Sequence, residues 1–200
     1  MAWVSLSRQD DWCEELALRF HDAIHGSPAP RAKGLVAGPE ARWGPALERV
    51  PPKILVRAVA SVLRTLLLPE YAQQRPHDRS ALRAVEAAEA WLAEPSMNRA
   101  LHAKAVAKVC TQARKDTLGS EHRIAEAARA VATAVTRTSD DVMRCDAVQA
   151  LASVEEHLLY RRSVGGEHDR QTNVREQIAE ALGTALRSEA SGRAAAPRAR

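Results

Sequence analysis

The sequence predicts an all-α protein, either an antiparallel multi-helix bundle or a short helical-hairpin array of about seven helices. Three observations support this fold class. Alanine is abundant and is the strongest helix former, whereas the chain has one Phe and two Tyr, residues that strands favour. Apolar residues recur at three- and four-residue spacing along most of the chain. The connections between these periodic segments are mostly short, as in helical bundles.

Four regions are predicted along the 200 residues. Residues 1–25 form an N-terminal amphipathic helix, because apolar residues recur four apart from Trp12 to Ile24. Residues 26–52 are punctuated by Pro and Gly and are expected to be a linker or an arm. Residues 53–187 form the helical bundle domain. Residues 188–200 are expected to be a disordered basic tail.

The first two predicted helices of the bundle have start and stop signals in the sequence. One runs from Lys53 to about Tyr71 behind Pro51-Pro52, and Pro69 is expected to kink or stop its last turn. The next lies within Pro76–Pro95, where the side chain of Asp78 or Ser80 can cap the first turn. Its apolar stripe continues to Trp91, and Pro95 ends it.

Four more helices follow. The first runs from Met97 to about Lys115, and we expect Leu101, Ala105 and Val109 to point inward. The others are recognised by apolar residues at helical spacing. These are Ile124, Ala128, Val131 and Val135 in one helix; Met143, Ala147, Ala150, Leu151, Val154 and Leu158 in the next, which starts after Ser139; and Val174, Ile178, Leu182 and Ala185 in the last, about Asp169 to Arg187.

The positive charge is concentrated at the C-terminus. Four arginines against one glutamate after position 186 account for +3 of the formal net charge of +4. A nucleic-acid-binding domain would carry a basic stripe on its folded part. The remaining chain is nearly neutral, so we do not expect nucleic acid as a partner.

Cysteine usage and hydropathy bear on the compartment. Cys13, Cys110 and Cys145 are odd in number and far apart, which predicts neither a disulfide framework nor a metal site. No apolar run reaches the ~18–20 residues that span a bilayer, and the N-terminus lacks a secretory pattern. These features predict a cytoplasmic protein without a membrane partner.

No catalytic or cofactor motif is found. His21 and His25 lie at i and i+4, a spacing that zinc sites use, but no further ligand is in register and we predict no metal. The remaining histidines and the cysteines do not form a nucleophile motif, and no glycine-rich phosphate loop is present. We therefore predict no catalytic residues, no cofactor and no enzymatic activity.

Partner binding is predicted at the start of the Pro76–Pro95 helix and on its tryptophan. Pro76, Asp78 and Arg79 precede the helix, and Arg83 follows one turn later. Trp91 has two interpretations: a core side chain on the apolar stripe, or a binding residue, because Trp and Arg are enriched in interface hot spots.

Residues from about 53 to 160 resemble a family of all-helical immunity proteins of bacterial polymorphic toxin systems. The matching residues are the Leu67–Tyr71 turn, then Pro76, Asp78 and Arg79, and then the Ala84–Ala87 stretch with Trp91. The resemblance implies an all-helical fold and a binding function: the chain would neutralise a toxin by covering its active site or by blocking its assembly.

Two other functional classes stay open. The chain is alternatively a helical adaptor or scaffold subunit of a bacterial defence or signalling assembly. A transcription-associated domain is a third interpretation, although no helix-turn-helix with base-reading residues is recognised. In the first two cases the partner is another protein, a toxin or an assembly component, and self-association is left open.

Overall fold

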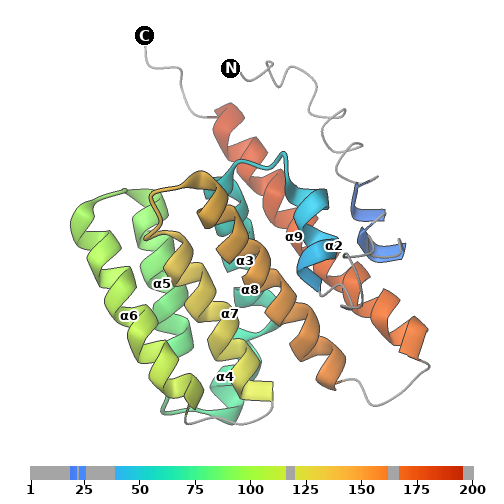
Figure 1. The fold of residues 1–200 in the computed structure, drawn as a ribbon, viewed down its shortest axis with the longest axis horizontal. Helices are drawn as coiled ribbons and strands as arrows, with labels where there is room; N and C mark the ends of the chain where they lie inside the picture. The colour runs from blue at the N-terminus through green and yellow to red at the C-terminus, as the bar shows by residue number, and fades with distance from the viewer. Residues whose placement is uncertain (1–18, 22, 26–38, 116–119, 162–166, 196–200) are drawn as a thin grey trace, which may run out of the picture.

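The computed structural model describes residues 19–21, 23–25, 39–115, 120–161 and 167–195 (Figure 1). The described part is helical and contains no strand, which confirms the all-α prediction, and the number of helices is close to the seven predicted. The helices are α2 Pro39–Leu47, α3 Pro52–Leu66, α4 Leu68–Gln74, α5 Ser80–Ala93, α6 Met97–Lys115, α7 Ser120–Ala134, α8 Asp140–Arg161 and α9 Glu167–Ala195.

Helices α3 and α8 lie at the centre of the bundle (Figure 1). Helices α5, α6, α7 and α8 form successive antiparallel hairpins, in which each helix packs on the next. Helix α9 covers α3 and α8 from the other side, and α2 packs on α8. Side chains are buried all around α8, as its central position requires.

The predicted helix from Lys53 to Tyr71 is divided in two. Helix α3 starts with Pro52 in its first turn, where a missing N–H costs nothing, and ends before Leu67. Pro69 cannot donate a hydrogen bond to the preceding turn, so it stops α3 as predicted. The same residue stands in the first turn of α4, where proline is tolerated, and the chain becomes helical again.

Helix α2 lies inside the segment that we expected to be a linker or an arm. Residues 39–47 are helical because Pro39 stands at the start, where proline is favoured, and because Trp43 and Leu47 on one face are fully buried. Burial of an indole and an isobutyl group outweighs the poor helix propensity of Gly44 and Pro45. Residues 26–38 lie outside the described part of the chain.

The predicted disordered tail is helical over much of its length. Helix α9 continues through residues 188–195, and residues 196–200 lie outside the described part. This correction has a local cause, since Ala, Glu and Arg in the tail are strong helix formers that extend an existing helix without a new nucleation cost.

The N-terminal helix is described only at residues 19–25, without residue 22, and these are helical. Phe20 and Ile24 are buried, and the Phe20 ring meets the Trp43 ring edge to face at 6.2 Å between centroids. The end of this helix is therefore docked on the bundle. Trp3 and Trp12 lie outside the described residues.

Helix α6 has the predicted bounds but the opposite orientation. Leu101, Ala105 and Val109 were expected to point inward and are exposed. The buried side chains are Ala103, Ala107 and Cys110. These three are small, so they allow α6 to approach α5 and α7 closely, which the larger apolar residues do not.

A buried carboxylate joins three helices. Glu155 on α8 accepts a hydrogen bond from the Trp43 indole N–H of α2 at 2.7 Å and one from Arg175 Nε of α9 at 2.9 Å. Arg175 also donates to the backbone oxygen of Ile24. All three side chains are at least nine-tenths buried. The polar groups satisfy one another, so burial of the charges is tolerated.

A second buried carboxylate fixes α4 against α8. Glu70 Oε2 lies 2.9 Å from His157 Nε2 and 2.5 Å from Arg161 Nη1, and its other oxygen accepts a hydrogen bond from Gln74. His157 is fully buried. Helix α4 is only seven residues long, so this contact to a central helix sets its position.

We expect Arg175→Met to lower the free energy of unfolding by ~3–5 kcal/mol, because the Glu155 charge is then buried without a cation. Urea denaturation followed by circular dichroism measures the loss. The matched control is Arg123→Met, which removes the partly exposed pair Arg123–Glu156 and should cost about 1 kcal/mol or less. Equal losses in the two variants would contradict this role of Glu155.

Candidate functional site

The turn between α4 and α5 carries most of the residues predicted to bind a partner. The backbone N–H of Arg75 donates a hydrogen bond to Tyr71 O at 2.8 Å and closes α4. The backbone N–H of Asp78 then donates to Arg75 O at 3.0 Å. Helix α5 then begins at Ser80. We call this region, from Leu68 to Arg83, the α4–α5 corner.

Asp78 holds the corner together. Its Oδ1 accepts the backbone N–H of Ser80, the first residue of α5, at 2.8 Å. The N-cap position is Arg79 and carries no side-chain capping bond, so the cap predicted from Asp78 or Ser80 is replaced by this bond from the residue before the N-cap. Asp78 Oδ2 accepts the Tyr71 hydroxyl at 2.7 Å and lies 3.9 Å from Arg75 Nη2. The turn is thus fixed both to the first turn of α5 and to the preceding helix.

These contacts set the charge states of the corner. Burial opposes ionisation of Asp78, but hydrogen bonds from Tyr71 and Ser80 and the charge of Arg75 outweigh it and lower the pKa of Asp78. Burial of the Tyr71 side chain, with the bond to Asp78, raises the pKa of Tyr71 to about 12. At neutral pH, Asp78 is therefore an anion and Tyr71 a neutral donor.

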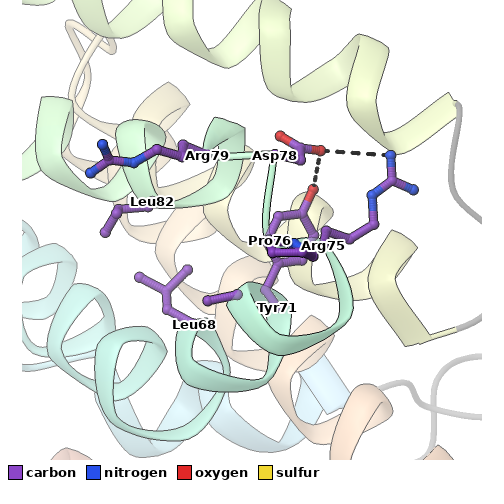
Figure 2. Close-up of a pocket in the computed structure, with 8 residues that line it drawn as sticks. Leu68, Tyr71, Arg75, Pro76, Asp78, Arg79 and Leu82 are labelled. Atoms are coloured by element: carbon purple, nitrogen blue, oxygen red, sulfur yellow. Dashed lines mark hydrogen bonds and ion pairs between the residues drawn. The ribbon is translucent and has the colours of Figure 1, made fainter.

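A pocket of about 180 Å³ opens at the corner (Figure 2). Its lining is mostly apolar, with charged groups from the turn: Leu68, Tyr71, Ala72, Arg75, Pro76, Asp78, Arg79 and Leu82. Figure 2 shows the side chains of Arg75 and Arg79 extending in opposite directions from the turn, with Leu68 and Leu82 on the side of Arg79. A cavity of this size admits a leucine or a phenyl side chain, since an engineered apolar cavity of ~150 Å³ binds benzene.

The structure brings together three of the five predicted binding residues. Pro76, Asp78 and Arg79 line the pocket, and Arg83 is exposed one helical turn beyond Arg79. The side chains of Arg79 and Arg83 form no ion pair or hydrogen bond with any residue that the structure describes. The guanidinium group of Arg79 at the pocket, and that of Arg83 one turn further along, are therefore available to anionic groups.

Trp91 lies apart from the pocket, near the other end of α5. Its ring is half-buried and packs against the core, and Lys53 Nζ stands 5.3 Å from the ring centroid. This position is intermediate between the two interpretations, because part of the indole is in the core and part of it stays exposed beneath an ammonium group.

The sequence analysis did not identify the apolar floor of the pocket. Leu68 and Leu82 belong to two predicted helices and Ala72 follows the predicted end of the first, and their meeting depends on the α3–α4 break. Tyr71 and Leu68 stand in the Leu-Pro-aromatic turn that carries the family resemblance, and this turn was the available signal.

The other candidate chemistry does not form a site among the described residues. The rings of His21 and His25 are 4.8 Å apart between centroids, but no group of three or more potential metal ligands occurs in the ranges that the structure covers. Burial raises the pKa of Cys110 to about 12, so its thiol is unreactive at neutral pH. None of the helices searched in the described chain is long and apolar enough to cross a membrane.

Comparison of the chain with protein families, with curated proteins and with solved structures gives no match.

We expect Asp78→Ala to destabilise the protein by about 1 kcal/mol at neutral pH, because the Ser80 N–H and the Tyr71 hydroxyl both lose their acceptor. Asp78→Asn keeps an acceptor and should cost less. The pKa of Asp78 is lower in the folded state than in the unfolded state. The ionised carboxylate therefore stabilises the fold above the unfolded-state pKa, and this contribution is lost as the pH falls through the folded-state pKa. Urea denaturation should therefore show the gap between wild type and Asp78→Asn closing as the solution is acidified, and a gap independent of pH would refute this.

We expect Trp91→Ala to cost roughly 2 kcal/mol, since only part of the ring is buried. Leu92→Ala, at the buried neighbouring position, should cost ~2–5 kcal/mol and serves as the control. Thermal or urea denaturation measures the loss in free energy of unfolding for each variant. A larger loss for Trp91→Ala than for Leu92→Ala would place the indole in the core.

Proposed function

We propose that the chain is a non-catalytic protein-binding domain and that the α4–α5 corner is its binding surface. The observation that carries the proposal is a mostly apolar pocket lined by Arg79, with Arg83 exposed one helical turn further along the chain; neither arginine has a partner among the described residues. The Tyr71–Asp78–Ser80 hydrogen bonds hold the corner in one conformation. A preorganised surface loses little entropy when it binds, which favours affinity.

The corner suits an acidic segment with one protruding apolar side chain. An aliphatic or aromatic group would enter the pocket against Leu68 and Leu82. Carboxylates next to it would pair with the guanidinium groups of Arg79 and Arg83, which favour the planar carboxylate geometry. Asp78 remains engaged with Tyr71 and Ser80, so it acts in shaping the site.

The partner that we propose is a bacterial toxin, which the chain neutralises by covering its active site or by blocking its assembly. Two features support this. Part of the resemblance to immunity proteins, the Leu67–Tyr71 turn with Pro76, Asp78 and Arg79, falls at the corner, whereas Ala84–Ala87 and Trp91 lie outside it. The corner is basic, which fits a toxin with an acidic surface. We place this encounter in the cytoplasm, in keeping with free Cys110 and Cys145.

The alternative is a helical adaptor or scaffold subunit. It is favoured by the exposed apolar side chains of α6, which stand on a different helix from the pocket and could contact a second protein. A scaffold holds several components, whereas an inhibitor of a toxin binds one cognate protein, so the number of partners separates the two functions.

Affinity purification of the tagged chain from its native host, with quantitative mass spectrometry, tests the proposal. We expect one stoichiometric partner. Ala72→Phe should fill the pocket and abolish binding of this partner. Arg79→Glu with Arg83→Glu should weaken its affinity at least tenfold, which is about 1.4 kcal/mol or more. Matched controls are Ala90→Phe, exposed on α5, and Arg187→Glu, exposed on α9.

Co-expression then distinguishes the functions. If the partner is a toxin, it arrests growth, and the wild-type chain but not the Ala72→Phe variant should relieve the arrest. Capture of several components, or of a partner without toxicity, would favour the adaptor. Loss of the partner in the two controls but not in the corner variants would refute the corner as the binding surface.

A further inference from the structure

Helix α6 presents an apolar stripe to solvent. Met97, Leu101 and Val109 are 75, 56 and 58% exposed, and Ala105 between them is exposed as well. These four residues are spaced four apart, so they form one continuous stripe along the helix. Figure 1 shows α6 at the edge of the bundle, and it packs against α5 and α7.

This grouping is unusual for the described surface. Single exposed apolar residues are normal in proteins, but a contiguous set on one helix marks an interaction site. Three of the five large apolar side chains that are exposed in the described residues belong to α6, and the other two, Val142 and Tyr160, lie at opposite ends of α8.

The charged side chains of α6 itself have one sign. Helix α6 carries five basic residues and no acidic one, as its sequence MNRALHAKAVAKVCTQARK shows. Arg99 is paired with Glu94 and Arg114 with Glu126. Lys104 and Lys108 are exposed beside the stripe and form no ion pair with any described residue. The outer face of α6 is therefore apolar along its middle and positively charged at its flank.

We propose that this face docks an acidic amphipathic helix of a partner protein. An apolar stripe with a four-residue repeat is complementary to the stripe of a second helix, in the helix-on-helix mode of recognition. Glutamate or aspartate flanking that second stripe would pair with Lys104 and Lys108, which selects an acidic helix over a basic one. The proposal does not depend on the α4–α5 corner.

Other occupants fit the same features less well. A second copy of the chain would place the Lys104 and Lys108 pair of one α6 against that of the other, and the like charges would repel. A membrane-surface helix characteristically adds aromatic residues to its apolar face, and this stripe has none. Nucleic acid would require polar or basic groups where Leu101 and Val109 stand.

The test uses the full chain and a fluorescently labelled synthetic helix with leucine at every fourth position and glutamate on both flanks. Fluorescence anisotropy should show saturable binding that weakens with added salt. Leu101→Ser with Val109→Ser should weaken binding at least tenfold. Lys104→Gln with Lys108→Gln should weaken it several-fold and remove most of its salt dependence.

The controls separate this face from the rest of the surface. Val142→Ser removes an exposed apolar side chain elsewhere, and Arg187→Glu reverses an exposed charge on α9, so neither should change the affinity. Equal binding of a peptide with lysine in place of glutamate, or no saturable binding, would overturn the proposal. Self-association that Leu101→Ser abolishes, or binding to vesicles containing phosphatidylserine, would overturn it in favour of a second copy or a membrane.

Discussion

The buried carboxylate of Glu155 is the contact on which the arrangement of the outer helices depends. It accepts hydrogen bonds from the Trp43 indole of α2 and the Arg175 guanidinium of α9, and Arg175 also donates a hydrogen bond to the backbone oxygen of Ile24. Apolar packing alone tolerates sliding between helices, because many registers bury similar areas. A buried charge with directional hydrogen-bond partners does not tolerate such sliding, since a shift in register would leave the charge unpaired. The second buried carboxylate, Glu70, has the same effect on the position of α4.

The α4–α5 corner is held in place by the second of these buried carboxylates. Glu70 and Tyr71 are adjacent on α4, so one side of the helix is attached to α8 through His157 while the next residue holds the turn through Asp78. Asp78 and Tyr71 are thereby committed to structure, whereas Arg79 and Arg83 form no ion pair with a described residue. The binding surface that we propose would therefore separate the residues that shape it from those that contact the ligand, which is the arrangement expected of a preorganised site.

The sequence predicted the fold class and most helix bounds because the apolar period is strong in α3, α5 and α7. It placed Pro76, Asp78 and Arg79 together because their turn is local. It did not predict the pocket, which needs Leu68 and Leu82 from two helices, nor the role of Glu155, whose partners lie 112 and 20 residues away. Helix α6 was oriented wrongly because larger apolar residues were assumed to face the core, whereas close packing selected Ala103, Ala107 and Cys110. Helix α2 was missed because Gly and Pro mask the burial of Trp43.

The small side chains beneath α6 also have a consequence for how the bundle opens. Methyl and thiol groups remove little apolar area from water, so α6 is held less strongly than α3 or α8, which bury Leu and Val along their length. Local unfolding follows the weakest tertiary contacts, and amide hydrogens of α6 should exchange with solvent before those of the central helices. A bundle built this way has a stable interior and one edge helix, α6, that is held by weaker apolar contacts.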